Sequence, residues 1–126
     1  MHEMSLAEGV LGVVEDTLAA QSPAAGREDV VRAVRLEIGR LAAVELEALR
    51  FAFDVVKRGT VADGAVLEVI DLPGAAWCMR CCATVPVAQR GDGCPACGSY
   101  QLQVTAGDEL RVKDIELAPA ALAAGR

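Results

Sequence analysis

The chain has 126 residues, which suffices for one modest core or for one small domain carrying an insert, but not for two full domains. Hydrophobic residues make up 53% of the chain and aromatic residues only 3%, so we expect a thin core of Val, Leu and Ala. The formal net charge of -6 disfavours nonspecific binding to nucleic acid or to an anionic membrane, and it suits cations or basic partners.

Residues 5–20 predict an amphipathic helix, because their apolar side chains recur at helical spacing. These apolar positions are Leu6, Val10, Leu11, Val13, Val14 and Leu18. The pattern of Ser5 followed three residues later by Glu8 is typical of a capping box at the start of this helix. Residues 30–39 then alternate between apolar and charged side chains, which predicts a strand.

Residues 44–57 predict a second helix, which ends at a Lys-Arg-Gly sequence that favours a helix C-terminus. Two further strands are predicted over residues 65–72 and 109–117. In the last strand the apolar phase shifts between Val112 and Ile115, as a β-bulge would cause.

These elements predict an α+β fold in which two helices pack on one face of a small three-stranded mixed sheet. We expect residues 1–72 and 105–126 to form this domain, and residues 73–104 to form a zinc ribbon inserted between its second and last strands. Short connections should make the two helices roughly parallel, with their N-termini at the same end of the sheet.

The N-terminal residues include Glu3 and Glu8 and lack the basic segment and apolar run of a secretory signal. Charged residues also interrupt every apolar stretch before the roughly 18 residues that a membrane span needs. We therefore expect a cytoplasmic protein. In that reducing compartment its five cysteines are expected as metal ligands or free thiols, and not as disulfides.

Two C-x2-C pairs, Cys78 with Cys81 and Cys94 with Cys97, predict a zinc site, because each tight turn can present two thiolates to one ion. A site closed by four thiolates leaves no position for water or substrate, so the zinc is interpreted as structural. The alternative is a set of buried or redox thiols. Cys82 is left over, and we expect a free thiol pointing away from the metal, with a fifth-ligand or exchange role as the alternative.

A ribbon that binds nucleic acid is the competing interpretation of these knuckles, but residues 71–104 contain no basic patch. Trp77 and Tyr100 are the only aromatic side chains there that could stack on bases. Catalysis has no support either, since the only histidine is His2 and the sequence has no G-x-S-x-G or phosphate-binding loop.

The sequence Met1-His2-Glu3 offers a second kind of metal site. The terminal amine, the amide and imidazole nitrogens of His2 and the amide of Glu3 could form the planar, nitrogen-rich field that suits Ni(II) or Cu(II). The partial positive charge of the adjacent helix N-terminus disfavours a protonated imidazole. Glu3 and Glu45 could offset the repulsion that the same charge exerts on a cation. A solvated histidine near a chain end is the alternative interpretation of His2.

Five segments together resemble the HypA/HybF family of hydrogenase maturation nickel metallochaperones. They are MHEMSL, EIGRLAAVELEALRFAFDVVKRGT, CMRC, CPAC and GDELRVKDIEL, in the order of that family. The resemblance implies nickel binding by Met1, His2 and Glu3, with Glu45 at the acidic position where some relatives carry aspartate. It also implies structural zinc on the four C-x2-C cysteines. Members of this family pass nickel to [NiFe] hydrogenase, acting on its large subunit with a partner GTPase, and in some bacteria also serve urease.

We therefore expect a nickel metallochaperone that carries Ni(II) as cargo and Zn(II) as a structural ion, and that is not an enzyme. One alternative is a zinc-ribbon adaptor that binds protein or nucleic acid and has no nickel role. Another is a redox module that uses its C-x2-C pairs, which would form reversible disulfides and lose zinc on mild oxidation.

Overall fold

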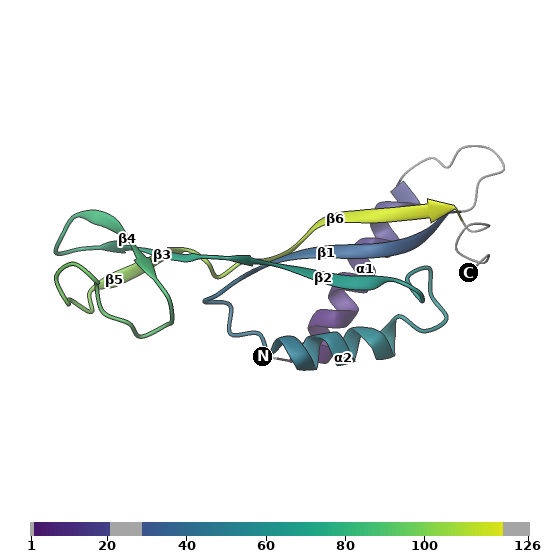
Figure 1. Cartoon of the computed structure of the whole chain (residues 1–126), viewed down its shortest axis with the longest axis horizontal. Helices are drawn as coiled ribbons and strands as arrows, with labels where there is room; N and C mark the ends of the chain where they lie inside the picture. Colours follow the sequence, from purple (N-terminus) through teal and green to yellow (C-terminus); the bar gives the residue numbers. More distant parts are fainter. Residues whose placement is uncertain (1, 21–28, 120–126) are drawn as a thin grey trace. The chain divides into compact units, whose positions relative to one another are not determined.

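A computed structural model of the chain describes residues 2–20 and 29–119 (Figure 1). Its elements are α1 (Glu3–Ala20), β1 (Asp29–Gly39), α2 (Leu46–Val56), β2 (Val66–Leu72), β3 (Gly74–Cys78), β4 (Ala83–Val87), β5 (Leu102–Ala106) and β6 (Leu110–Pro119). The strands form two three-stranded sheets, with strand orders β2-β1-β6 and β4-β3-β5. Neither helix described here is long and apolar enough to cross a membrane.

The chain divides into two compact units, and the division runs through β1, β2 and β6. Unit 1 consists of Met1–Leu36, Val44–Glu68 and Val112–Arg126, and it carries both helices. Unit 2 consists of Glu37–Ala43 and Val69–Arg111, and it carries all five cysteines. The domain boundaries expected from the sequence, at residues 72/73 and 104/105, stay a prediction.

The sheet β2-β1-β6 is mixed, because β1 runs parallel to β2 and antiparallel to β6. Later residues of β1 contact later residues of the β2 segment, as in a parallel pair. Later residues of β1 contact earlier residues of the β6 segment, as in an antiparallel pair. The parallel contacts are Val31 N to Val61 O, Arg35 to Glu68 and Arg40 N to Leu72 O, and the antiparallel ones are Gly39 N to Glu109 O, Arg111 to Glu37 and Arg32 to Glu116. The predicted α+β fold with two helices and a mixed three-stranded sheet is confirmed.

The core of unit 1 combines one face of each helix with apolar residues of β1. Phe53 of α2, exposed by only 1%, is the largest fully buried side chain among the described residues, and Val34 and Leu36 of β1 are buried completely. The helices contribute Ala7, Val10, Leu11 and Val14 from α1, and Leu49 and Ala52 from α2. Over residues 34–38 the alternation that predicted β1 therefore does separate a buried face from the one that carries Arg35 and Glu37, whereas Val31 and Ala33 are also buried earlier in the strand.

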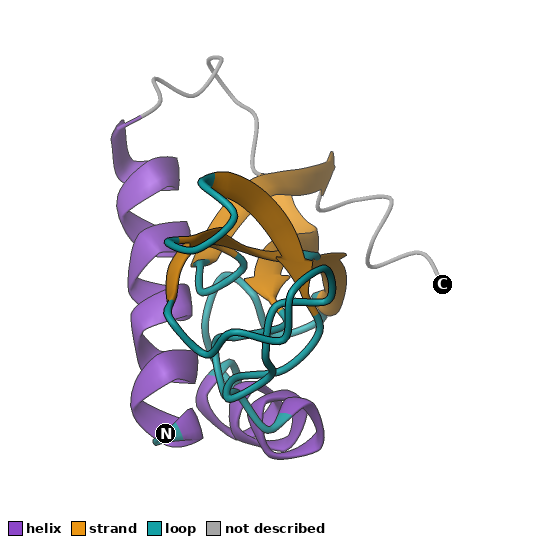
Figure 2. Cartoon of the chain, turned by 90° about the vertical axis from the view of Figure 1, so that its left-hand side faces the viewer, coloured by secondary structure: helices purple, strands orange, loops and turns teal. Residues whose placement is uncertain are grey.

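Two expectations about the helices are wrong. The helices cross one another instead of running parallel, as Figure 2 shows with α1 in side view and α2 nearly end-on. Short connections fix which chain ends meet, whereas the crossing angle is set by how side-chain ridges of one helix fit the grooves of the other. The capping box is also wrong: Leu6 N donates to His2 O at 3.0 Å, so the first turn begins before Ser5, which lies inside α1.

The sheet β4-β3-β5 is a feature that sequence patterns did not predict. Its central strand, β3, pairs antiparallel with both neighbours, and Trp77 lies opposite Thr84 on one side and Gln103 on the other. Two small clusters form the core of unit 2. The first consists of Leu41, Ala76 and Val87, the second of Cys78, Val85 and Cys94, and Leu102 packs against both.

Three glycines of unit 2 allow its backbone segments to pack directly against one another. A Cβ atom on Gly39 would overlap the carbonyl group of Gly107, and a Cβ atom on Gly107 would overlap the Cα atom of Gly74. Gly107 also has φ +98°, a conformation that L side chains rarely adopt. Leu41 N donates to Gly107 O at 2.7 Å, so the contact is held by a backbone hydrogen bond.

We predict that Gly39→Ala lowers the free energy of unfolding by about 3 kcal/mol or more, because its methyl group must displace backbone and not a flexible side chain. Gly9→Ala is the matched control, since nothing lies within 4 Å of its Cβ and alanine should stabilise α1 by about 1 kcal/mol. Denaturant unfolding of the zinc-loaded proteins measures both. A Gly39→Ala protein as stable as wild type would contradict the close packing.

Candidate metal centres

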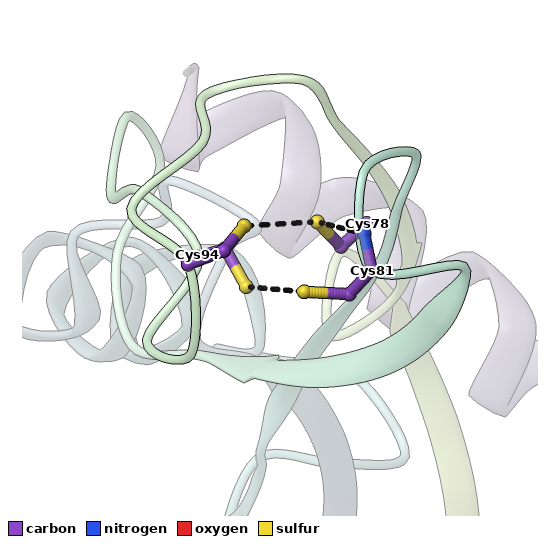
Figure 3. A group of neighbouring side chains, drawn as sticks. Cys78, Cys81 and Cys94 are labelled. Carbon is purple, nitrogen blue, oxygen red and sulfur yellow. Dashed lines mark hydrogen bonds between the residues drawn. The ribbon is translucent and has the colours of Figure 1, made fainter.

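Four cysteine sulfurs converge in unit 2 (Figure 3). The Sγ atoms of Cys78, Cys81, Cys94 and Cys97 all lie within 4.8 Å of one another. The sulfurs of Cys78 and Cys97 are 3.7 Å apart, and those of Cys81 and Cys94 are 3.9 Å apart. Each close pair takes one sulfur from each C-x2-C sequence, so the two turns face each other across the site.

These distances fit a tetrahedral zinc ion. With a Zn–S bond of about 2.3 Å, tetrahedral geometry puts neighbouring sulfurs about 3.8 Å apart, which matches both close pairs. Over residues 2–20 and 29–119, this is the one group of three or more His, Cys, Asp or Glu side chains arranged to hold a metal ion. All four donors are thiols, so zinc bound here would be closed to water and would serve structure.

The two zinc knuckles, which are the C-x2-C turns at residues 78–81 and 94–97, have the same backbone geometry. In the first, Cys82 N donates to Cys78 O at 2.8 Å, and in the second, Gly98 N donates to Cys94 O at 2.8 Å. Cys82 and Gly98, each directly after the second cysteine of its pair, both have positive φ angles, 54° and 77° respectively. The fifth cysteine therefore occupies a turn position that favours glycine.

The Cys82 thiol lies outside the four-sulfur cluster. Its Sγ is exposed and 3.6 Å from the carbonyl oxygen of Met79, to which it donates. This placement agrees with the expectation that Cys82 stands apart from the two C-x2-C pairs. The sequence signal for its turn position was available in the other knuckle, where Gly98 stands at the corresponding place.

The environment of the four sulfurs is uneven. Backbone N–H groups of Cys97 and Ala96 donate toward the sulfur of Cys94 and lower the pKa of that thiol to about 7. Hydrogen bonds with the thiols of Cys97, Cys78 and Cys94 raise the pKa of Cys81 to about 12. A bound cation favours the thiolate form of every ligand, so zinc would replace these thiol contacts by four metal bonds.

The residues predicted to bind nickel lie at the start of α1 and of α2. Met1 lies outside the described residues. His2 is exposed, and its carbonyl oxygen accepts the first hydrogen bond of α1. Glu3 is half-buried, and Glu45 is the exposed N-cap residue of α2, with φ −83° and ψ 104°.

A hydrogen bond joins two of these residues across 42 positions of sequence. Glu45 N donates to Glu3 Oε2 at 3.1 Å, so a carboxylate of α1 accepts an N–H group at the start of α2. This hydrogen bond is the main reason that the pKa of Glu3 is lowered. The expectation from the sequence that the two helices begin at the same end, with Glu3 near Glu45, agrees with this contact. The hydrogen bond itself was not predicted, because sequence reasoning treated Glu3 as a ligand.

Comparisons with known proteins match nearly the whole chain to one family. Residues 1–117 match a family described as hydrogenase/urease nickel incorporation, metallochaperone, HypA. The hydrogenase maturation factors HypA of Azotobacter chroococcum mcd 1 and of Azotobacter vinelandii are 58% and 54% identical to this chain over 117 residues. Each alignment covers 93% of this chain and 99% of the relative.

A solved structure has the same fold. The solution structure of the Ni metallochaperone HypA from Helicobacter pylori superposes with a TM-score of 0.65 at 21% sequence identity. The match covers 93% of this chain and 97% of that chain. At this identity the likeness concerns the fold.

We predict that Cys94→Ser abolishes stoichiometric zinc binding and unfolds unit 2, since its sulfur is both a site member and a member of the second core cluster. Cys82→Ser is the matched control and should keep one zinc per chain, because its thiol lies outside the cluster. Metal analysis and amide hydrogen exchange measure the two effects. Full zinc content in Cys94→Ser would rule out the proposed ligand set.

We also predict that Cys82→Gly keeps its zinc and raises the free energy of unfolding by up to about 1 kcal/mol, because glycine adopts positive φ without the side-chain clash. Gly98→Ala makes the opposite change in the other C-x2-C turn and should lower the free energy of unfolding by about 1–2 kcal/mol. Denaturant titrations at equal zinc content compare them. Loss of zinc from Cys82→Gly would instead assign Cys82 a ligand role.

Proposed function

The chain belongs to the HypA family of hydrogenase and urease nickel incorporation metallochaperones, and we propose on this basis that it binds Ni(II) at its N-terminus and delivers it to a maturing [NiFe] hydrogenase. Nickel is the cargo of this protein. Zinc on Cys78, Cys81, Cys94 and Cys97 is its structural ion.

The donor set at the N-terminus suits nickel. The proposed ligands are the amine of Met1, the amide and imidazole nitrogens of His2 and the amide of Glu3, with the carboxylate of Glu45 beside them. Nitrogen donors in a plane suit Ni(II), and fused chelate rings hold them around one ion. His2 is exposed, so an ion bound there would be open to exchange with a partner's ligands.

The structural observation that supports this location of the site is the hydrogen bond from Glu45 N to Glu3 Oε2. It supports a composite site, because it ties the residues that follow His2 to the helix start that bears Glu45. An acidic side chain at that point can offset the repulsion between a cation and the positive ends of the two helices.

The contrast between the two metal sites supports a carrier without catalytic activity. A four-thiolate site retains its metal, whereas a chain-end chelate can release it. We propose that nickel passes to the hydrogenase large subunit with the help of a maturation GTPase, and in some bacteria toward urease. Reduced thiols as ligands suit the cytoplasm as the place of this transfer.

We predict that His2→Ala weakens nickel binding by about 100-fold or more, since the loss even of an outer partner of a metal ligand costs 10–100-fold. Zinc content and the free energy of unfolding should stay at wild-type values, because His2 is exposed and its carbonyl still starts α1. Calorimetric titration of zinc-loaded protein with NiCl2 measures the affinity.

An extension of about six residues without histidine before Met1 provides the matched test of the amine, because it moves that donor out of reach and leaves His2 in place. A single added residue would not serve, since His2 would then stand third from the new amine and could form another planar chelate with it. The extension should weaken binding and abolish the absorption band of planar Ni(II). Equal nickel affinity in all three proteins would refute the N-terminal site and favour the zinc-ribbon adaptor without a nickel role.

A further inference from the structure

Two carboxylates, Glu3 and Glu45, lie at the proposed nickel site, and their side chains have different surroundings. Glu3 Oε2 accepts the hydrogen bond from Glu45 N, and the Glu3 side chain is half-buried. Glu45 is exposed, and its side chain makes no capping hydrogen bond to its own helix. The Glu3 carboxylate thus accepts the N–H group of the N-cap residue itself, which in a capping box is bonded by a Glu or Gln side chain three residues later, a position that Ala48 occupies here.

The geometry of α2 explains why an acceptor is favourable there. The first backbone N–H groups of a helix have no partner within the helix, and the helix dipole adds partial positive charge at the same end. A carboxylate is therefore a suitable acceptor, and charge-assisted hydrogen bonds of this kind are the stronger ones. Glu3 supplies it from another element, because it is the first residue of α1.

We propose that the Glu3 carboxylate is a positioning group and not a nickel ligand: it ties the start of α1 to the start of α2 and so holds the N-terminal donors in place. This inference rests on the proposed nickel site. Glu3 joins the metal only through its backbone amide, and its side chain stays on Glu45 N when the ion is bound.

A positioning role predicts that loss of the Glu3 side chain changes the nickel affinity but not the ligand field of the bound nickel. Without the Glu3 side chain, the residues before α1 must be ordered when nickel binds, and ordering about one residue costs about tenfold in affinity. The ligand field should not change, because every donor atom is still present. Glutamine keeps an oxygen at the same position that can accept the hydrogen bond, so it should rescue the effect of alanine.

The test compares Glu3→Ala and Glu3→Gln in the zinc-loaded full chain with a native N-terminus. Glu47→Gln is the matched control, since Glu47 is an exposed acid in the first turn of the same helix and makes no such contact with residues 2–20 or 29–119. Three quantities are measured for each protein: the Kd for Ni(II), the position of the nickel d–d absorption band, and the exchange rate of the Glu45 amide without nickel.

We expect Glu3→Ala to raise Kd about tenfold and to speed exchange of the Glu45 amide, with the absorption band unmoved. Glu3→Gln should stay within about threefold of wild type, and Glu47→Gln should match wild type in all three quantities. A band shift in either Glu3 variant would overturn the proposal, because the carboxylate would then be a ligand. An unchanged exchange rate of the Glu45 amide in Glu3→Ala would also overturn it. So would a loss of nickel affinity in Glu47→Gln as large as that in Glu3→Ala.

The exchange measurement also separates this inference from the proposed function. It is made without nickel, so it tests the contact between Glu3 and α2 even if the wild-type protein takes up no nickel. If the wild-type protein bound no nickel while its Glu45 amide stayed protected, the contact between Glu3 and α2 would stand. The proposed nickel site would be refuted, and with it the positioning role of Glu3.

Discussion

The four sulfurs of unit 2 are a constraint on which the rest of that unit depends, because they form the candidate metal site and two of the four cysteines belong to its core. Cys78 and Cys94 make up most of its second core cluster, in which Val85 is the remaining buried member. The first cluster contains one leucine, one alanine and one valine. So little apolar surface cannot offset the conformational entropy of the strands and turns, and metal binding must contribute to folding.

Local sequence patterns predicted those features whose cause is local. The C-x2-C spacing indicated which sulfurs meet, and alternation over residues 34–38 of β1 separated buried from charged side chains. Strands β3 to β5 escaped prediction, since each has five residues and depends on distant partners such as Ala76 with Val104. The helix crossing and the true start of α1 likewise depend on packing between α1 and α2, which no short window of sequence contains.

Cys82 illustrates the difference between the chemistry of a residue and its place in the backbone. As a fifth thiol beside a zinc knuckle it invites a chemical role. Its positive φ and the hydrogen bond from its N–H to Cys78 O instead match those of Gly98 in the other knuckle. The position is thus defined by the turn that brings two sulfurs to one ion, and a thiol there is tolerated at a cost in backbone strain.

The proposed nickel site at the N-terminus poses the opposite problem to the candidate zinc site of unit 2. A cargo ion must exchange, so its donors should be few and exposed, yet donors at a chain end are costly to order. In the proposed site, a hydrogen bond from α2 to the carboxylate beside His2 would meet both requirements, because it holds the backbone without occupying a coordination position. Adjacency to histidine in sequence makes Glu3 look like a ligand. The fold instead gives its side chain a partner 42 residues away, and in the proposed site it is the amide of Glu3 that faces the metal.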